Sequence, residues 1–201
     1  MFLLKCSSIN SLLVAFWGSF RISELLPEER YSFNEKDALM VSDLFLNKDS
    51  IGLWLRSEKV SSDYGNIIEI WKLDSRPDLD PVIALSAFLE RRSNIPGGET
   101  LPVFIWQDGS NLTKGQFNAV LKDLLSMFPE FSTSTRDFWA GHSFRSGLPT
   151  LLQSLGFQED EIKRWGRWKS MAYQAYLKDF SARRKTKEKL TQTFDEILKY
   201  I

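Results

Sequence analysis

Residues 141–176, GHSFRSGLPTLLQSLGFQEDEIKRWGRWKSMAYQAY, carry the pattern on which the prediction of the fold rests. They contain the one histidine of the chain, His142, and Arg145 follows three positions later. Residues three apart share one side of a helical turn, so the two side chains are neighbours. An arginine fork can bind two oxygens of a phosphate, and an imidazole can add a bond or move a proton. Taken alone, the pair is weak evidence, because such a pair is most often a partly buried histidine beside a surface arginine.

The charge around this stretch is one-sided. The 201-residue chain has 26 Lys and Arg against 26 Asp and Glu, which gives a formal net charge of zero. Residues 142–189 hold eleven of the basic residues and five of the acidic ones, so this segment is +6 and the remainder is −6. A basic segment of this kind is either a solvated helical face or a surface that contacts phosphates.

Composition excludes several classes of protein. A hydrophobic fraction of 43% with 15 Phe and 7 Trp is too high for a disordered tail, and 26% charged residues is too high for a membrane bundle. Cys6 has no second cysteine to pair with, and one Cys with one His cannot form a structural zinc site. Residues 1–20 lack a basic start and a cleavage site, so they predict a core helix rather than a signal peptide.

The remaining pattern predicts a mainly α fold with a small antiparallel β-sheet, in one domain over residues 1–201. Apolar residues repeat at helical spacing in 9–20, 81–92, 113–125, 142–155 and 190–201, and shorter helices are expected at 159–165 and 171–180. Ser19 is expected to cap a short helical turn, and Gly166 to end the helix at 159–165. Branched and aromatic runs at 51–55 and 67–71 predict a hairpin with a long polar loop, and 103–106 predicts a further strand.

Two segments resemble the catalytic domain of the tyrosine recombinase (phage integrase) family, and most closely its eukaryotic branch in retroelements and cryptons. Residues 16–26, FWGSFRISELL, are similar to the first box of the family. Residues 141–147, GHSFRSG, followed by 166–170, GRWKS, and Tyr176-Leu177, are similar to its second box. Both boxes occur in the order of the family, and the resemblance covers nearly the whole chain.

The resemblance implies roles for the matching residues. Arg21 and Arg145 would clamp the scissile phosphate and stabilise the charge of the transition state. His142 would hydrogen-bond the phosphate and assist proton transfer. Trp168 would donate its indole N–H and pack against the site, although a tryptophan in this position can also be plain core. Glu24 would support the arginine and histidine cluster.

The leaving group and the nucleophile are assigned by the same resemblance. Lys59, in the hairpin loop, would be the general acid for the 5′-oxygen, and Arg56 nearby makes this assignment the least secure. Tyr176 lies eight residues after Trp168 and precedes Leu-Lys, as the attacking tyrosine of the family does, whereas Tyr173 lies only five residues after it. We therefore predict Tyr176 as the nucleophile. The residues predicted to contact the DNA backbone are Arg167, Lys169, Tyr173, Arg183 and Arg184, the last two of which also fit a solvated or nuclear-targeting cluster.

The resemblance implies DNA strand cleavage and rejoining through a 3′-phosphotyrosyl intermediate, in site-specific recombination or DNA integration by a transposable element. It implies no metal and no cofactor, because the ester conserves the bond energy. The expected partner is double-stranded DNA, with a tetramer on DNA and weak or no self-association without it, and no membrane. The expected location is the nucleus in a eukaryote and the cytoplasm otherwise.

The chain departs from the family in one respect: it begins almost at the first box, so we expect the N-terminal core-binding domain to be absent. A catalytic fragment of a longer protein fits this better than a domesticated descendant. The helix expected within 186–201 either is exchanged between protomers or docks on its own domain. The alternative functions are a non-catalytic DNA-binding or assembly module and, second, a type IB topoisomerase-like activity.

Overall fold

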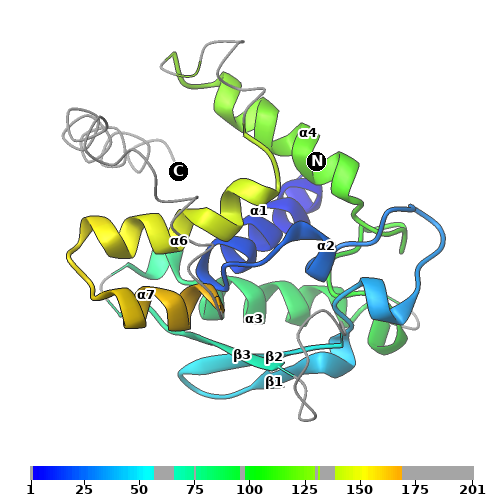
Figure 1. The fold of residues 1–201 in the computed structure, drawn as a ribbon. Coiled ribbons are helices and arrows are strands. Elements are labelled where there is room, and N and C mark those ends of the chain that lie inside the picture. Colours follow the sequence, from blue (N-terminus) through cyan, green and yellow to red (C-terminus); the bar gives the residue numbers. More distant parts are fainter. Residues whose placement is uncertain are drawn as a thin grey trace.

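The computed structural model describes residues 2–56, 66–74, 76–95, 98–129, 131 and 139–168. Helices dominate this part of the chain, as the sequence predicts, and one three-stranded sheet accompanies them (Figure 1). The α-helices are α1 (Phe2–Trp17), α2 (Ile22–Leu25), α3 (Pro81–Arg92), α4 (Lys114–Ser126), α6 (His142–Ser154) and α7 (Glu159–Gly166). Short 3₁₀ turns are η1 (Glu35–Asp37), η2 (Val41–Asp43), η3 (Pro77–Leu79) and η4 (Gly98–Thr100). None of the described helices has both the length and the apolar composition required to cross a membrane.

The sheet has the order β1 (Leu44–Leu46), β2 (Ser50–Leu55) and β3 (Asn66–Trp71), and both pairs are antiparallel. The predicted hairpin corresponds to β2 and β3, with Leu53 paired to Ile68. The first strand was missed because three residues give too short a stretch for an alternating pattern. Ile51, Leu53 and Leu55 face the core, in keeping with the two-residue period of a strand.

The strand predicted at 103–106 is wrong. Val103 and Phe104 are fully buried, which explains the apolar run, but their backbone bonds go to separate loops. The N–H of Val103 donates to the carbonyl of Leu39 at 2.7 Å, and the carbonyl of Phe104 accepts from Leu112 at 3.0 Å. The segment therefore forms isolated bridges instead of a ladder.

Side-chain caps set the first residues of helices α3 and α4. The carboxylate of Asp80 accepts from the N–H groups of Val82 and Ile83 at 2.7 and 3.1 Å, directly before a proline at the first position of α3. At α4, the hydroxyl of Thr113 accepts from the backbone N–H of Gln116 at 3.2 Å. In return, Oε1 of Gln116 accepts from the backbone N–H of Thr113 at 3.0 Å. These two bonds form a capping box.

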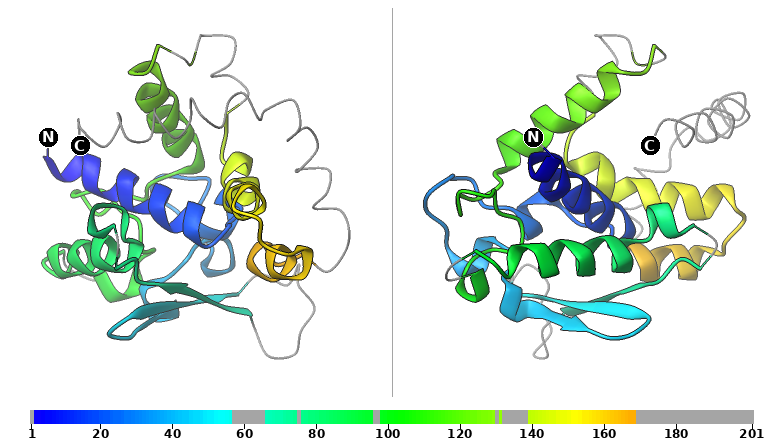
Figure 2. Two further views of the ribbon diagram at one scale, coloured as in Figure 1. Left: turned by 90° about the vertical axis from the view of Figure 1, so that its left-hand side faces the viewer. Right: turned by 180° about the vertical axis from the view of Figure 1, so that it is seen from behind.

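The helices are arranged in layers above the sheet. Helix α3 lies over the sheet, α1 packs on α3, and α6 packs on α1, with α7 beside α6 (Figures 1 and 2). Helix α4 extends away on the side opposite to the sheet (Figure 2). The main core joins these layers through buried residues such as Leu25, Leu53, Leu85 and Phe104. At the edge of this core, the turn after α1 meets α6 and the end of α7. The first box (16–26) and the second box (141–147 and 166–170) come together there.

Candidate phosphate-binding site

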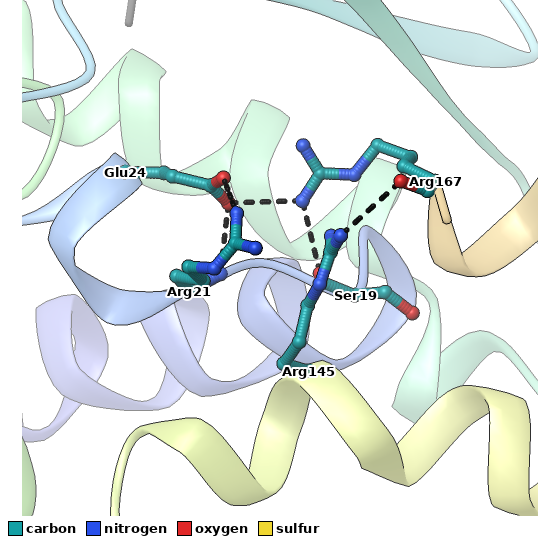
Figure 3. Close-up of polar contacts among 5 residues, drawn as sticks. All are labelled: Ser19, Arg21, Glu24, Arg145 and Arg167. Atoms are coloured by element: carbon teal, nitrogen blue, oxygen red, sulfur yellow. Dashed lines mark hydrogen bonds and ion pairs between the residues drawn. The ribbon is translucent and has the colours of Figure 1, made fainter. Parts of the chain in front are cut away.

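Glu24 is the acidic centre of the site. It is the third residue of α2, and one of its carboxylate oxygens, Oε2, accepts from the backbone N–H of Arg21 at 2.8 Å. The same oxygen accepts from Nη2 of Arg167 at 2.9 Å, and Oε1 accepts from Nη1 of Arg21 at 3.0 Å. Only 8% of the Glu24 side chain is exposed. One carboxylate thus joins the start of α2 to the end of α7 (Figure 3).

The arginines hold Glu24 in its charged form. Burial of the carboxyl alone would raise its pKa, but the charge and hydrogen bond of Arg167 lower it, and so do the Arg21 N–H and the charge of Arg145. The net result is a pKa below the ordinary value of 4.5. The carboxylate therefore remains ionised at neutral pH while cations surround it.

Arg145 lies on α6 and is 5% exposed. Its Nη1 donates to the carbonyl of Ser19 at 2.9 Å, and its Nη2 donates to the carbonyl of Arg167 at 3.4 Å. Its guanidinium carbon lies 5.2 Å from the centre of the Trp168 ring. Each terminal nitrogen of an arginine carries two hydrogens, so one bond apiece to a carbonyl leaves the fork geometry intact. The buried cation is thereby held in one orientation.

Arg167 lies just after α7 and turns inward. Its Nη2 donates to the Ser19 carbonyl at 2.9 Å as well as to Glu24, and its guanidinium lies 4.9 Å from the centre of the Phe20 ring. Burial lowers the pKa of this guanidinium, while Glu24 acts to raise it. Its Nη2 is engaged within the protein, whereas its buried Nε has no hydrogen-bond partner in the described structure. The predicted contact with the DNA backbone stays a prediction.

Two glycines allow the close packing around these arginines. A Cβ on Gly166 would lie 1.9 Å from the ring of Trp168, so only glycine lets that ring lie against the end of α7. A Cβ on Gly141 would lie 2.3 Å from the side chain of Ile22, where α6 begins beside α2. Both glycines belong to the motifs of the second box. Close contacts with neighbouring side chains, and not unusual backbone angles, require glycine at these two positions.

The backbone around the site differs from the sequence prediction at two residues. Gly166 belongs to α7, and the residue with left-handed backbone at its end is Arg167, with φ of 56°. Ser19 does not cap α2, because Arg21 occupies that position. Ser19 instead adopts φ of 47°, and its carbonyl accepts from both Arg145 and Arg167. Local sequence rules assign these roles to glycine and to a serine hydroxyl, and tertiary contacts override them here.

Among the described residues of the predicted site, His142 and Arg21 are exposed. His142 is the first residue of α6 and its side chain is exposed. The start of that helix is anchored to α4, because the Gly141 N–H donates to Oδ1 of Asn118 at 2.9 Å. Asn118 carries no motif and was missed by the sequence analysis. Arg21 is 49% exposed at the side chain, in contrast to the buried Arg145.

The structure thus brings together Arg21, Glu24, Arg145, Arg167 and Trp168 of the predicted residues, and adds the Ser19 carbonyl. Figure 3 shows all of these except Trp168. Three arginines surround one carboxylate, so this cluster carries an excess of positive charge. Chemically it can hold an anion such as a phosphate diester. Within the described part of the chain, no group of three or more His, Cys, Asp or Glu residues is placed to hold a metal ion.

Several predicted residues lie outside the described part of the chain. They are the predicted nucleophile Tyr176, the predicted general acid Lys59, the backbone-contact residues Lys169, Tyr173, Arg183 and Arg184, and the helices expected at 171–180 and within 186–201. Arg56, the neighbour of Lys59, is described: its Nε donates to Asp43 at 2.7 Å and its Nη1 to Glu35 at 2.6 Å. These acids hold Arg56 at the base of the loop.

Known proteins resemble this chain in structure and not in sequence. No family model and no curated protein matches it. The fold is similar to that of the XerH site-specific recombinase bound to its difH substrate in a pre-cleavage complex, with a TM-score of 0.60 and 13% identity over 92% of this chain and 46% of that one. It is also similar to the Tn1549 transposon integrase in complex with circular intermediate DNA, with a TM-score of 0.52 and 18% identity over 88% of this chain and 56% of that one.

These comparisons define the fold class: it is the helix-rich fold, with a small antiparallel sheet, of tyrosine recombinase catalytic domains. The chain spans about half the length of the structures that it matches. The narrower resemblance to the eukaryotic retroelement and crypton branch is not confirmed and stays a prediction.

Proposed function

We propose that this chain is the catalytic domain of a site-specific DNA recombinase or integrase that cleaves and rejoins DNA strands. The observation that carries the proposal is the convergence of Arg21 and Arg145 from distant parts of the sequence, around Glu24, on a recombinase fold. The structural neighbours, XerH and the Tn1549 integrase, were both solved with DNA. The partner proposed for this chain is therefore double-stranded DNA.

In the proposed reaction the hydroxyl oxygen of Tyr176 attacks the scissile phosphorus. A phosphotyrosyl ester forms on the 3′ side, and the bond to the 5′-oxygen breaks. The proton of the tyrosine passes toward His142, and Lys59 supplies a proton to the leaving oxygen. A 5′-hydroxyl on a second strand reverses these steps and rejoins the DNA. Binding as a tetramer on DNA and a source in a transposable element belong to the same proposal, as does location in the nucleus in a eukaryote and in the cytoplasm otherwise.

The arginines supply the electrostatic part of this reaction. Negative charge builds up on the phosphate oxygens as the fifth bond forms, and fixed donors stabilise that charge without having to reorganise. The bonds from Arg145 to two carbonyls fix its fork in advance. Loss of one such donor costs about 10²–10³ in rate.

The test is capture of the covalent intermediate. The chain is incubated with a pool of nicked duplexes whose sequence around the nick is randomised, and the adduct is resolved on a denaturing gel. We expect an adduct that is absent in Tyr176→Phe, retained in Tyr173→Phe, strongly reduced in Arg145→Ala and retained in Arg164→Ala. Arg164 is a suitable control because its side chain is 76% exposed and pairs only locally with Asp160 in the described structure. An adduct that persists in Tyr176→Phe would refute the assignment, and uniform absence of adduct would favour a non-catalytic DNA-binding module.

A further inference from the structure

Arg167 occupies an unusual place for a charged side chain. With φ of 56°, it holds the left-handed backbone position after α7, where glycine is the ordinary residue. The guanidinium is 14% exposed at the side chain and points back toward the turn between α1 and α2 (Figure 3). An arginine at a helix end normally reaches solvent or the last carbonyls of its own helix. Here it instead bonds Ser19, 148 residues earlier in the chain.

Arg167 and Arg145 are linked by two routes. They share one acceptor, because Nη1 of Arg145 and Nη2 of Arg167 both donate to the Ser19 carbonyl at 2.9 Å. The backbone carbonyl of Arg167 also accepts from Nη2 of Arg145 at 3.4 Å. The result is a closed ring of contacts from Arg145 through Ser19 to the Arg167 side chain and back through the Arg167 backbone.

The ring depends on the orientation of one peptide. A carbonyl oxygen has two lone pairs, and both arginines use those of Ser19. Ser19 itself has left-handed backbone, which is uncommon for a residue other than glycine and is stabilised by contacts that hold it there. Arg167 provides such a hold, because the same Nη2 that bonds Ser19 also bonds the buried carboxylate of Glu24. Ser19 is thereby tied to α2 through a single cationic nitrogen.

We propose that Arg167 is a positioning residue: its guanidinium fixes the Ser19 carbonyl and thereby orients Arg145 toward the substrate phosphate. The part that concerns substrate rests on the proposed function, whereas the orientation of Arg145 does not. The competing role is the one that the sequence suggests, a direct contact between Arg167 and the DNA backbone. The two roles differ in whether Arg167 acts when Arg145 is missing.

The first experiment measures the motion of Arg145 by NMR in the free chain. Rotation about its Nε–Cζ bond exchanges Nη1 and Nη2, and it requires both carbonyl bonds to break. We expect separate signals for the two terminal nitrogens in the wild type, assigned by their disappearance in Arg145→Lys. In Arg167→Gly we expect the rotation to become at least tenfold faster and the signals to merge. Arg164→Gly, on the same helix, is the control and leaves them separate.

The choice of variants separates positioning from folding. Glycine suits the left-handed backbone at 167, so Arg167→Gly removes the guanidinium without straining the helix end. Far-UV circular dichroism of that variant is expected to match the wild type. Arg167→Lys is the conservative variant: it offers one cationic nitrogen, one bond shorter than the Nη2 that makes both contacts. We expect it to restore part of the slow rotation.

The second experiment uses a double-mutant cycle on DNA binding and cleavage. Binding of a fluorescent random-sequence duplex is measured against salt, since each lost phosphate contact lowers the log–log slope by about 0.9. If Arg167 acts only through Arg145, adding Arg167→Gly to Arg145→Ala changes neither this slope nor the yield of covalent adduct. A further fall in slope of about 0.9, or unchanged Arg145 rotation in Arg167→Gly, overturns the proposal. Absence of adduct in the wild type would count against the proposed function, and the NMR result would still decide the role of Arg167.

Discussion

Replacing Glu24 by glutamine tests whether one carboxylate holds the two boxes together. Oε2 accepts two bonds, from the Arg21 N–H and Arg167, and Oε1 accepts one from the Arg21 side chain. Either orientation of a glutamine amide places its NH₂ group against at least one N–H donor. The substitution keeps the shape of the side chain, removes its charge and creates a clash between donors.

The size of the effect follows from burial. Removing one partner of a buried ion pair typically costs about 3–5 kcal/mol. Arg167 keeps its bond to Ser19, and the exposed pair with Arg21 contributes little, so we expect the lower end, about 3 kcal/mol. For a domain of this size that lowers the melting temperature by about 6–12 °C.

The pH dependence gives an independent signature. The folded-state pKa of Glu24 lies below its unfolded value of 4.5, so its contribution to stability is complete above that value and is lost as the pH falls through the folded pKa. The difference in stability between the wild type and Glu24→Gln should therefore be constant near neutral pH and shrink in acid. Urea denaturation at a series of pH values measures it.

Glu161→Gln is the matched control for this prediction. Glu161 is also the third residue of its helix, and it accepts from the backbone N–H of Gln158 at 2.8 Å, just as Glu24 does from Arg21. Its capping hydrogen bond is exposed to solvent, so this variant reports the loss of the cap alone. If both variants lose the same stability with the same pH dependence, Glu24 does not act through Arg167 and the reasoning is refuted.

Three further predictions concern packing and charge. Gly166→Ala should destabilise the fold by about 1–3 kcal/mol and reduce adduct formation, since the ring of Trp168 must move; thermal denaturation and near-UV circular dichroism measure this, and an unchanged spectrum would contradict it. Asn118→Ala should cost about 1–3 kcal/mol in urea denaturation, because the buried N–H of Gly141 loses its acceptor; full stability would show that the bond is replaced. DNA binding by this chain alone should be weak and steeply salt-dependent, and a tight, salt-insensitive complex in anisotropy measurements would argue against the proposed backbone contacts.

Local sequence rules were sufficient for the starts of α3 and α4. The capping box at Thr113 and the carboxylate of Asp80 set helix starts through bonds to residues two or three positions away, and the proline after Asp80 fits the first position of α3. The hairpin was predictable for a similar reason, because runs of branched and aromatic residues mark β2 and β3 and a polar stretch separates them. The run at 103–106 failed because burial, and not strand pairing, makes it apolar.

The site was predictable only in part. The resemblance of the two boxes named Arg21, Glu24, Arg145 and Trp168, which the fold brings together. The inward turn of Arg167 was not predictable, because it depends on a left-handed backbone at a non-glycine residue and on an acceptor 148 positions away. No pattern of side chains can indicate an acceptor that is a backbone carbonyl.

The Ser19 carbonyl has a consequence for engineering. Arg145 and Arg167 both depend on this one peptide, so the two boxes cannot be exchanged between relatives one at a time. A chimera that takes 16–26 from one parent and 141–168 from another inherits a turn and a pair of arginines that were never selected to fit each other. We expect activity in such chimeras to return only when both segments come from the same parent. The two boxes therefore have to be exchanged together.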